Sequence, residues 1–306
     1  MINLLFIAPD TSSFLDKNYY FLENELAQIT NLTVYRDSGK ISDIIDKISH
    51  KPDFILILND IGNEVSPVIK GLSSINIPTG LIVNDVHRLK ETRRHYIRKN
   101  NISYLFSVVR NKFYEIYPEY INKMEWLPHF VNTDVFKDYG LIKNIDLLMI
   151  GAINDFYPLR QKIIQYYKEN NNFIYHGHPG YRDFNKEEEK RIYIGKKYAR
   201  EINKSKIFFT CPSIFNYPIK KYFQALACKS LLLAPTFKEL EDLGFIPNVH
   251  FVEINKDNFK EKASHYLNNV EDREKITEQG YQFIHQNHSL KIRAQQLVDK
   301  LEDILS

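Results

Sequence analysis

Short apolar runs alternate with helix-patterned segments along the chain, and this alternation constrains the fold more than any other feature. The run 53–60, DFILILND, is continuously apolar in its middle, as expected for a strand that is buried on both faces of a parallel sheet. Further strands are predicted at 3–9, 32–36, 77–85 and 102–109, with helices at 15–30, 41–48, 64–74 and 88–100. This order predicts a doubly wound α/β domain.

A second series of the same kind follows the irregular segment 124–144, which has no sustained period. Its predicted strands are 145–151, 173–178, 191–195, 206–212, 230–236 and 250–254, with helices at 158–170, 257–268, 271–286 and 289–305. We therefore expect two Rossmann-like domains facing each other across a cleft. The expected boundaries are 1–128, a linker at 129–143, a second domain at 144–288 and a final helix at 289–306 that packs back toward the first domain.

Composition limits the class of protein. With 43% hydrophobic and 26% charged residues, the 306-residue chain has the profile of a globular protein, and no apolar run approaches the ~20 residues of a membrane span. The N-terminus lacks the basic region of a signal peptide, so a cytoplasmic location is expected. The two cysteines, Cys211 and Cys228, lie in apolar stretches and are expected to be buried thiols. A net charge of +3 does not by itself indicate nucleic-acid binding.

Ligands of open α/β sheets bind beyond the carboxyl ends of the strands, so site residues are expected in the loops there. Gly151 follows a predicted strand and precedes the helix that carries Arg160, a position suited to an anion, although simple turn chemistry is an equal alternative. The loop HGHPGY begins with His176 and Gly177, which are cleft-lining candidates, and the histidines lack the partners of a zinc site. Gly195 ends the predicted strand 191–195, where a nucleotide base can rest on backbone atoms.

The segment 213–244 carries the most information. Lys220 and Lys221 stand before a helix expected to begin at Tyr222, and basic side chains beside a helix N-terminus favour a phosphate group. Gln224 would lie in the first turn of that helix, with its amide near a ribose hydroxyl. A solvated pair of lysines is the alternative.

A family resemblance rests on this segment. The run Lys221-Tyr222-Phe223-Gln224-Ala225-Leu226-Ala227-Cys228-Lys229-Ser230-Leu231-Leu232-Leu233, followed by Glu239-Leu240-Glu241-Asp242-Leu243-Gly244, resembles group 1 glycosyltransferases of the GT-B fold. The likeness is greatest to the spore maturation protein B-like members. WLPHFVNTDVF at 126–136 resembles their linker phrase, and Asp272-Arg273 with the Gly280 turn resembles their closing helices. The likeness covers 126–306 well and the first 125 residues only as a pattern of elements.

The resemblance implies a nucleotide-sugar donor, with UDP favoured, seated in the C-terminal domain, and an acceptor domain before it. It also implies that no metal is needed, and the absence of an Asp-x-Asp triplet agrees with this. Arg160, Lys220 and Lys221 would then offset the charge of the leaving group. Retaining relatives have two glutamates spaced eight apart, and the matching positions here are the amides Asn216 and Gln224. Lys229 replaces a glycine of the family pattern.

In the first half, Asp85 and His87 follow the predicted strand 77–85. A histidine with a nearby carboxylate suits a general base for an acceptor hydroxyl in inverting transfer. The competing interpretation is a helix cap at Asp85 with His87 on the surface. Asp10, at the end of the first strand, is a weaker candidate for acceptor binding. The basic run 88–101 is either a solvated face or a patch for an anionic membrane surface or a polyanionic acceptor.

The sequence thus predicts a cytoplasmic glycosyltransferase, peripheral to the inner face of the membrane if the basic run binds there. Its acceptor is a glycan, glycolipid or protein, and no nucleic-acid partner is expected. Two alternatives stay open. One is a nucleotide-sugar-binding subunit without activity, and the other is an epimerase or hydrolase of nucleotide sugars on the same fold.

Overall fold

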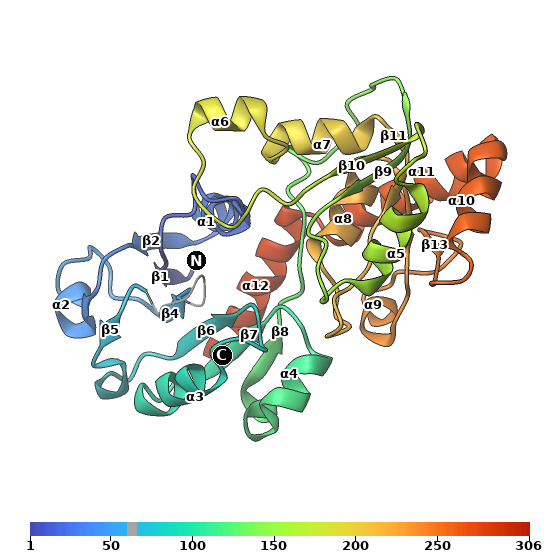
Figure 1. Ribbon diagram of the computed structural model, residues 1–306. Coiled ribbons are helices and arrows are strands. Elements are labelled where there is room, and N and C mark those ends of the chain that lie inside the picture. Colours follow the sequence, from blue (N-terminus) through green and yellow to red (C-terminus); the bar gives the residue numbers. More distant parts are fainter. Residues whose placement is uncertain (60–65) are drawn as a thin grey trace. The chain divides into compact units, whose positions relative to one another are not determined.

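A computed structural model describes residues 1–59 and 66–306 (Figure 1). The chain forms two compact units. Unit 1 comprises Met1–Ser12, Lys17–Pro128 and Lys291–Ser306, and unit 2 comprises Ser13–Asp16 and His129–Leu290.

Unit 1 contains a six-stranded sheet in the order β2-β1-β4-β6-β7-β8, with every neighbouring pair parallel. The strands are β1 Asn3–Ile7, β2 Asn31–Tyr35, β4 Phe54–Ile57, β6 Thr79–Val83, β7 Tyr104–Ser107 and β8 Met124–Trp126, and β3 Gly39–Lys40 pairs separately with β5 Ile69–Lys70. The helices are α1 Asn18–Ile29, α2 Ile41–Ile45, α3 Lys90–Lys99 and α4 Asn111–Ile116, with 3-10 turns η1 Leu72–Ser74 and η2 Pro118–Lys123. The last helix, α12 Leu290–Leu305, belongs to this unit from Lys291 onward.

Unit 2 repeats the plan with a five-stranded parallel sheet in the order β10-β9-β11-β12-β13. The strands are β9 Ile145–Ile150, β10 Phe173–His176, β11 Ser205–Phe209, β12 Leu231–Ala234 and β13 Val252–Glu253. The helices are α5 Pro158–Tyr167, α6 Lys186–Arg191, α7 Gly195–Asn203, α8 Lys220–Ala227, α9 Lys238–Asp242, α10 Phe259–Asn268 and α11 Val270–Asn287.

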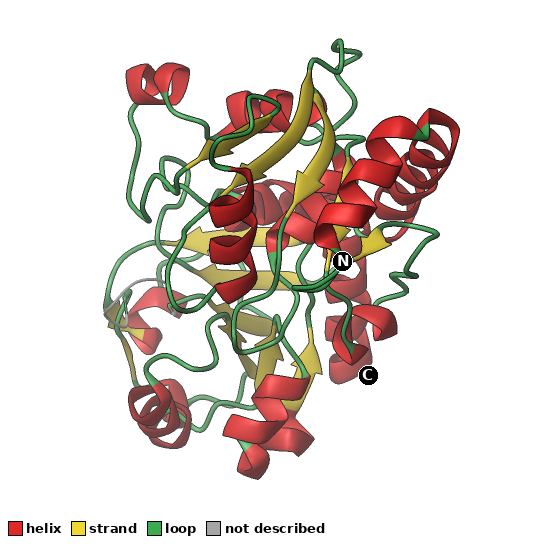
Figure 2. Cartoon of the chain, turned by 45° about the vertical axis from the view of Figure 1, so that its right-hand side comes forward, coloured by secondary structure: helices red, strands yellow, loops and turns green. Residues whose placement is uncertain are grey.

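Helices cover both faces of the unit 2 sheet (Figure 2). Because successive side chains of a strand point to opposite faces, Leu148 and Phe208 pack with residues of α7, α8 and α11, whereas Leu147 and Phe209 pack with residues of α5 and α10. This burial on both sides explains why residues 147–150, 207–209 and 231–234 of the three central strands are continuously apolar.

The predicted fold class is confirmed: each unit is a doubly wound parallel α/β domain. The prediction that the final helix packs back toward the N-terminal domain is also confirmed, and Lys300 of α12 forms an ion pair with Glu125 of β8, 3.3 Å apart. Cys211 and Cys228 are buried free thiols, as expected.

Three predicted elements are wrong. The strand at 191–195 does not form, because α6 ends at Arg191 and Gly195 opens α7. Part of the helix predicted at 64–74 falls outside the described residues, and 66–74 contains β5 and η1 instead. Met124–Trp126, expected to be irregular, forms β8, an edge strand too short to show a period.

Two positions of the family pattern have structural roles. Lys229 follows the end of α8 with φ of +56°, the left-handed conformation for which the family pattern has glycine. Its ammonium lies 3.2 Å from Asp138 and 3.1 Å from Glu278, so ion pairs hold the residue in place. Gly280 does not form a turn but lies inside α11, where a Cβ would stand 2.3 Å from the carbonyl oxygen of His250.

Candidate functional site

The unit 2 sheet reverses its winding at β9, which has β10 on one side and β11 on the other. Ligands of such sheets bind in the crevice beyond the carboxyl ends of the strands at this switch point. Gly151 follows β9 directly, and Thr210 and Cys211 follow β11. The site therefore begins with the loops after these two strands.

Arg160 joins the two loops. Its Nη1 donates to the carbonyl oxygen of Ala152 at 3.2 Å, and its Nη2 donates to the carbonyl oxygen of Cys211 at 3.1 Å and to Oγ1 of Thr210 at 3.3 Å. The guanidinium lies 3.8 Å from the ring centre of Tyr157. The residue is only 3% exposed, and within the described ranges 1–59 and 66–306 its Nε has no hydrogen-bond partner. A nearly buried cation is thus fixed at the switch point.

Gly151 makes room for two cations. A Cβ at this position would lie 3.0 Å from Nη1 of Arg160 and 3.0 Å from Cε of Lys221. The backbone φ of +147° is also one that L side chains rarely adopt. Glycine is therefore required here for its backbone as well as for the space, and the two basic side chains converge on it.

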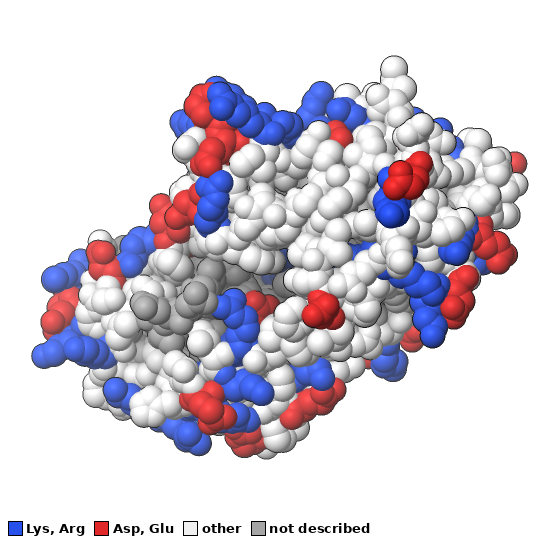
Figure 3. Space-filling view, viewed as in Figure 1, with Lys and Arg blue, Asp and Glu red and all other residues white. Residues whose placement is uncertain are grey.

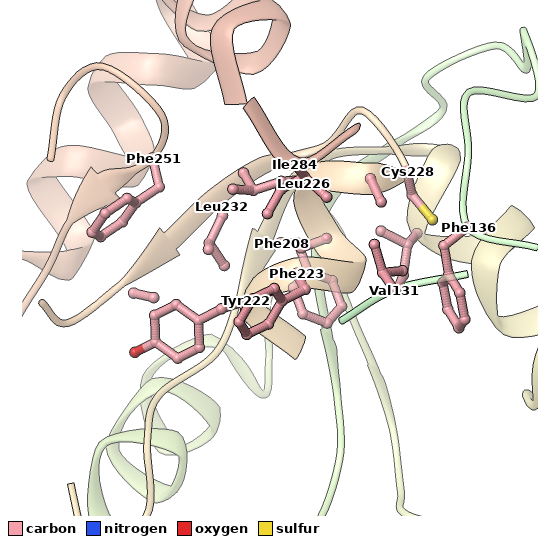
Figure 4. Packing of buried hydrophobic residues seen from close by; sticks show 14 of the residues in the cluster. Val131, Phe136, Phe208, Tyr222, Phe223, Leu226, Cys228, Leu232, Phe251 and Ile284 are labelled. Carbon is pink, nitrogen blue, oxygen red and sulfur yellow. The ribbon is translucent and has the colours of Figure 1, made fainter. Parts of the chain in front are cut away.

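Helix α8 positions the lysines. Tyr222, Phe223 and Leu226 are fully buried in the core of unit 2 (Figure 4), which leaves Lys220 and Lys221 at the first two positions of the helix. The helix begins two residues earlier than predicted. Its N-cap residue, Ile219, supplies no side-chain hydrogen bond to the first turn, so the positive end of the helix dipole adds to the charge of the lysines.

Burial changes the titration of both lysines. Burial, with the charges of Arg160 and Lys220 adding repulsion, lowers the pKa of Lys221 to about 7. Burial lowers the pKa of Lys220 to about 7 as well, and its Nζ pairs with the Asp16 carboxylate. Three basic side chains thus lie close together at the switch point, and burial disfavours the charged form of both lysines, a kind of perturbation that is common at functional sites.

The two histidines of the HGHPGY loop have different surroundings. His176 lies 3.1 Å from Oε1 of Glu201 and stacks on Tyr193 with ring centres 3.9 Å apart. Burial, together with the charges of Lys221 and Arg160, lowers the pKa of His178 to about 4, so this ring is neutral at physiological pH. Among the described residues no group of three or more His, Cys, Asp or Glu side chains is arranged to hold a metal ion.

The two amides differ in exposure. Asn216 is exposed and has φ of +54°, a conformation that asparagine tolerates better than most residues. Gln224 is half-buried and its Oε1 accepts a hydrogen bond of 3.3 Å from the Tyr198 hydroxyl. Because α8 begins at Lys220, Gln224 is its fifth residue and not part of its first turn.

Gly177 and Gly195 are the remaining glycines of the predicted site. Gly177 follows β10 and has space for a Cβ, whose nearest contact would be the Tyr175 hydroxyl at 3.8 Å. Gly195 has φ of +50° and opens α7, with nothing within 4 Å of a Cβ. It lies at a helix start and not at a strand end.

Asp85 and His87 belong to unit 1 and follow β6. The helix cap considered for Asp85 is not formed, because α3 begins at Lys90 after the N-cap residue Leu89. Burial lowers the pKa of His87, while the Asp85 carboxylate partly opposes that shift. The imidazole is therefore neutral, and able to accept a proton, at neutral pH.

Part of the basic run 88–101 is structural. Arg93 is only 4% exposed and donates to the carbonyl oxygen of Arg88 at 2.9 Å and to the Tyr117 hydroxyl. Arg94 pairs with Glu91 at 2.7 Å and with Glu119 at 2.6 Å. In the space-filling view, basic and acidic side chains are intermixed over the visible face (Figure 3).

Sequence reasoning missed Thr210, Tyr157, Tyr198 and Asp16. Thr210 was placed inside the strand predicted at 206–212, but β11 ends at Phe209, so Thr210 lies in the loop that follows it. Nothing in the sequence indicates that Asp16, some 200 residues away, would pair with Lys220.

Comparisons with known proteins support the fold. A family model described as "Glycosyl transferase-like" matches residues 159–299, which is less than half of the chain. Among curated protein sequences none matches the chain. Solved structures match over nearly all of it at low identity, and they show that each half takes part in a GT-B fold, the two-sheet architecture of a class of glycosyltransferases.

Three of these structures illustrate the likeness. Anabaena HepE in complex with UDP and glucose has a TM-score of 0.63 and 10% identity, covering 99% of this chain and 100% of its own. A glycosyltransferase from Rickettsia africae has a TM-score of 0.66 and 11% identity, covering 99% and 98%. Sucrose-phosphate synthase from Thermosynechococcus elongatus has a TM-score of 0.64 and 10% identity, covering 99% of each chain.

None of the described helices combines the length and the apolarity that crossing a bilayer requires.

Replacing Lys221 by methionine should stabilise the protein. The pKa of a lysine in the unfolded chain is about 10.4, whereas that of Lys221 in the folded protein is about 7. Between pH 7 and 10 the unfolded state therefore binds a proton at this residue that the folded state does not. The burial penalty is complete below pH 7 and disappears toward pH 10. Denaturant unfolding should therefore show Lys221→Met more stable than the wild type at pH 6–7, with the difference fading by pH 10. The control, Lys275→Met, removes an exposed lysine of α11 and should show no such trend. A destabilised Lys221→Met protein at pH 6 would contradict the buried-charge account.

Proposed function

We propose that the protein is a metal-independent GT-B glycosyltransferase that moves a hexose from a nucleoside diphosphate donor to a hydroxyl group. The observation that carries the proposal is the convergence of Arg160 and Lys221 on Gly151 at the switch point of unit 2. Two half-buried or buried cations beside a helix N-terminus suit a diphosphate, whose charge rises as the glycosidic bond breaks.

UDP is the favoured nucleotide. The likeness to HepE, which was solved with UDP and with UDP-glucose, supports this choice at the level of the fold. We infer that the sequence likeness of 126–306 to the spore maturation protein B-like enzymes reflects the same donor class.

We assign the donor contacts as follows. The diphosphate lies among Gly151, Arg160, Lys220, Lys221 and the first turn of α8. Gln224 bonds a ribose hydroxyl, and its fixed contact with Tyr198 orients its amide. Backbone atoms beside Gly195 receive the base, and the loop of His176 and Gly177 lines the sugar with Asn216. With basic groups in place to neutralise the leaving group, no cation is needed.

In the reaction the bond between the sugar C1 and the phosphate oxygen breaks, and the nucleoside diphosphate leaves with the electron pair. The acceptor oxygen forms the new bond to C1, and its proton passes to a base. We propose His87 as that base, with Asp85 orienting it, because burial keeps the imidazole neutral at neutral pH.

The acceptor class that fits is a glycan, a glycolipid or a protein in the cytoplasm. Within the basic run, Lys90, Arg98 and Lys99 are exposed, and we propose them as the residues that would contact an anionic membrane surface if the acceptor is a lipid.

A second candidate function is a nucleotide-sugar-binding subunit without activity. The amides at 216 and 224 favour it, because they stand where retaining relatives have glutamates. This candidate predicts UDP binding without turnover of any UDP-sugar in the presence of acceptors.

Nucleotide binding should depend on Lys221 and Arg160. Since a hydrogen bond to a charged group contributes ~1.5–3 kcal/mol, Lys221→Ala should weaken UDP binding by about tenfold or more in titration calorimetry. Arg160→Lys should weaken it similarly, because lysine cannot bridge the two loops. Lys275→Ala is the matched control and should bind like the wild type. Equal affinity in all four proteins would exclude the proposed diphosphate seat.

Transfer should depend on His87 without any change in UDP affinity. Loss of a general base costs about 10²–10⁴-fold in rate, so His87→Gln should reduce turnover of the UDP-sugar by that order while calorimetry with UDP is unchanged. His95→Gln, an exposed histidine of α3, is the control. The acidic limb of the wild-type pH profile should lie below 6.5, the ordinary pKa of histidine, because burial lowers the pKa of His87. Full activity of His87→Gln would remove this residue from the mechanism.

A further inference from the structure

The segment Ser13–Asp16 interrupts unit 1 in the sequence but belongs to unit 2. Two backbone hydrogen bonds hold it against the residues that precede α6. The N–H of Leu15 donates to the carbonyl oxygen of Arg182 at 3.0 Å, and the N–H of Phe184 donates to the carbonyl oxygen of Ser13 at 2.8 Å. The segment therefore has a defined place in unit 2, as a short stretch paired with a neighbouring chain segment.

Side chains reinforce this pairing. The hydroxyl of Ser13 donates to Oδ1 of Asp183 at 2.9 Å. The guanidinium of Arg182 lies 3.9 Å from the ring centre of Phe184, which is only 2% exposed, and pairs with Glu188 of α6 at 2.7 Å. The residues that receive the segment are thus themselves anchored in unit 2, and they fix where the segment ends.

Asp16 ends the segment, and its carboxylate pairs with Nζ of Lys220, the first residue of α8. The two side chains are each 25% exposed, so the ion pair is accessible from solvent. A carboxylate and a phosphate present the same kind of charged acceptor oxygen to an ammonium group. Asp16 therefore already occupies a binding direction of Lys220 that a phosphate would use.

The next step rests on the proposed function, in which Lys220 binds the diphosphate of the donor. We propose that Asp16 is an internal counter-ion that competes with the diphosphate for Lys220, so that nucleotide binding exchanges one anion for the other. The apparent affinity of a ligand falls by the fraction of molecules in which its binding group is available. Asp16 thus limits nucleotide affinity, and it favours release of the nucleoside diphosphate after transfer because it takes the place of the departing phosphate.

The opposite role for Asp16 would be to orient Lys220 toward the ligand. The two roles predict opposite signs for the same substitution. Removal of a competing carboxylate strengthens nucleotide binding, whereas removal of an orienting carboxylate weakens it. Asp16→Asn distinguishes them, because it removes the charge and keeps the size of the side chain.

Titration calorimetry of the full-length protein with UDP, and separately with inorganic pyrophosphate, measures the sign. Asp16→Asn should bind both about tenfold more tightly than the wild type, as expected if the ion pair forms in roughly nine of ten unliganded molecules. Asp257→Asn is the matched control, since it removes the carboxylate of another accessible lysine pair of unit 2, with Lys162 at 3.9 Å, and should leave both affinities unchanged. Equal or weaker binding by Asp16→Asn would overturn the proposal.

A double-mutant cycle with Lys220 tests whether the gain comes from this pair. In a Lys220→Met background, Asp16→Asn should no longer strengthen binding, because the two anions have no shared cation to compete for. A full gain in that background would contradict competition at Lys220. Circular dichroism checks the folding of each variant, and Asp16→Ala replaces Asp16→Asn if the latter does not fold.

The same titrations separate this proposal from the proposed function. If Lys221→Ala weakens UDP binding while Asp16→Asn leaves it unchanged, competition is wrong and the diphosphate seat stands. If Asp16→Asn strengthens pyrophosphate binding but UDP binds to none of the variants, competition at Lys220 stands and the nucleotide assignment is wrong. Binding of neither anion to any variant would contradict both.

Discussion

The placement of positive charge at the switch point of unit 2 is the constraint on which the candidate site depends. Arg160 is nearly buried and holds the loops after β9 and β11 together through backbone carbonyl groups, while Lys221 approaches the same glycine from α8. Neither burial nor repulsion favours this arrangement in the unliganded protein. Under the proposed function, an anion with two negative groups beside these cations would offset that cost.

The surrounding core makes the arrangement rigid. Because both faces of the sheet are buried, β9 and β11 cannot shift without disturbing helices on either side. The buried face of α8 fixes the direction of its N-terminus, and the Tyr222 hydroxyl donates to the carbonyl oxygen of Pro235 at 2.8 Å, tying the helix to the loop after β12. The buried apolar segment 231–234 thus supports the site from within the core.

The sequence predicted the fold class because parallel strands buried on both faces leave an unmistakable pattern, as in 53–60 and 230–236. The strand predicted at 191–195 was wrong, although Ile192 and Ile194 alternate as they would in a strand. The capping box of Asn185 and Glu188 starts helix α6, which ends at Arg191. Too few residues then remain for a strand before α7 begins at Gly195. Within the site, strand-end position identified Gly151, and helix-start chemistry identified Lys220 and Lys221. The partners that define their electrostatics, Asp16 and Tyr198, come from other segments and follow only from tertiary packing.

Hydrogen exchange measured by mass spectrometry with and without UDP tests the central claim most directly, because it locates the ligand without any substitution. The account predicts that UDP protects peptides covering 151–160 and 210–224, where backbone amides border the two cations. Protection confined to peptides of unit 1, or none at UDP concentrations that saturate binding in calorimetry, would contradict the claim that the donor is held at the switch point of unit 2.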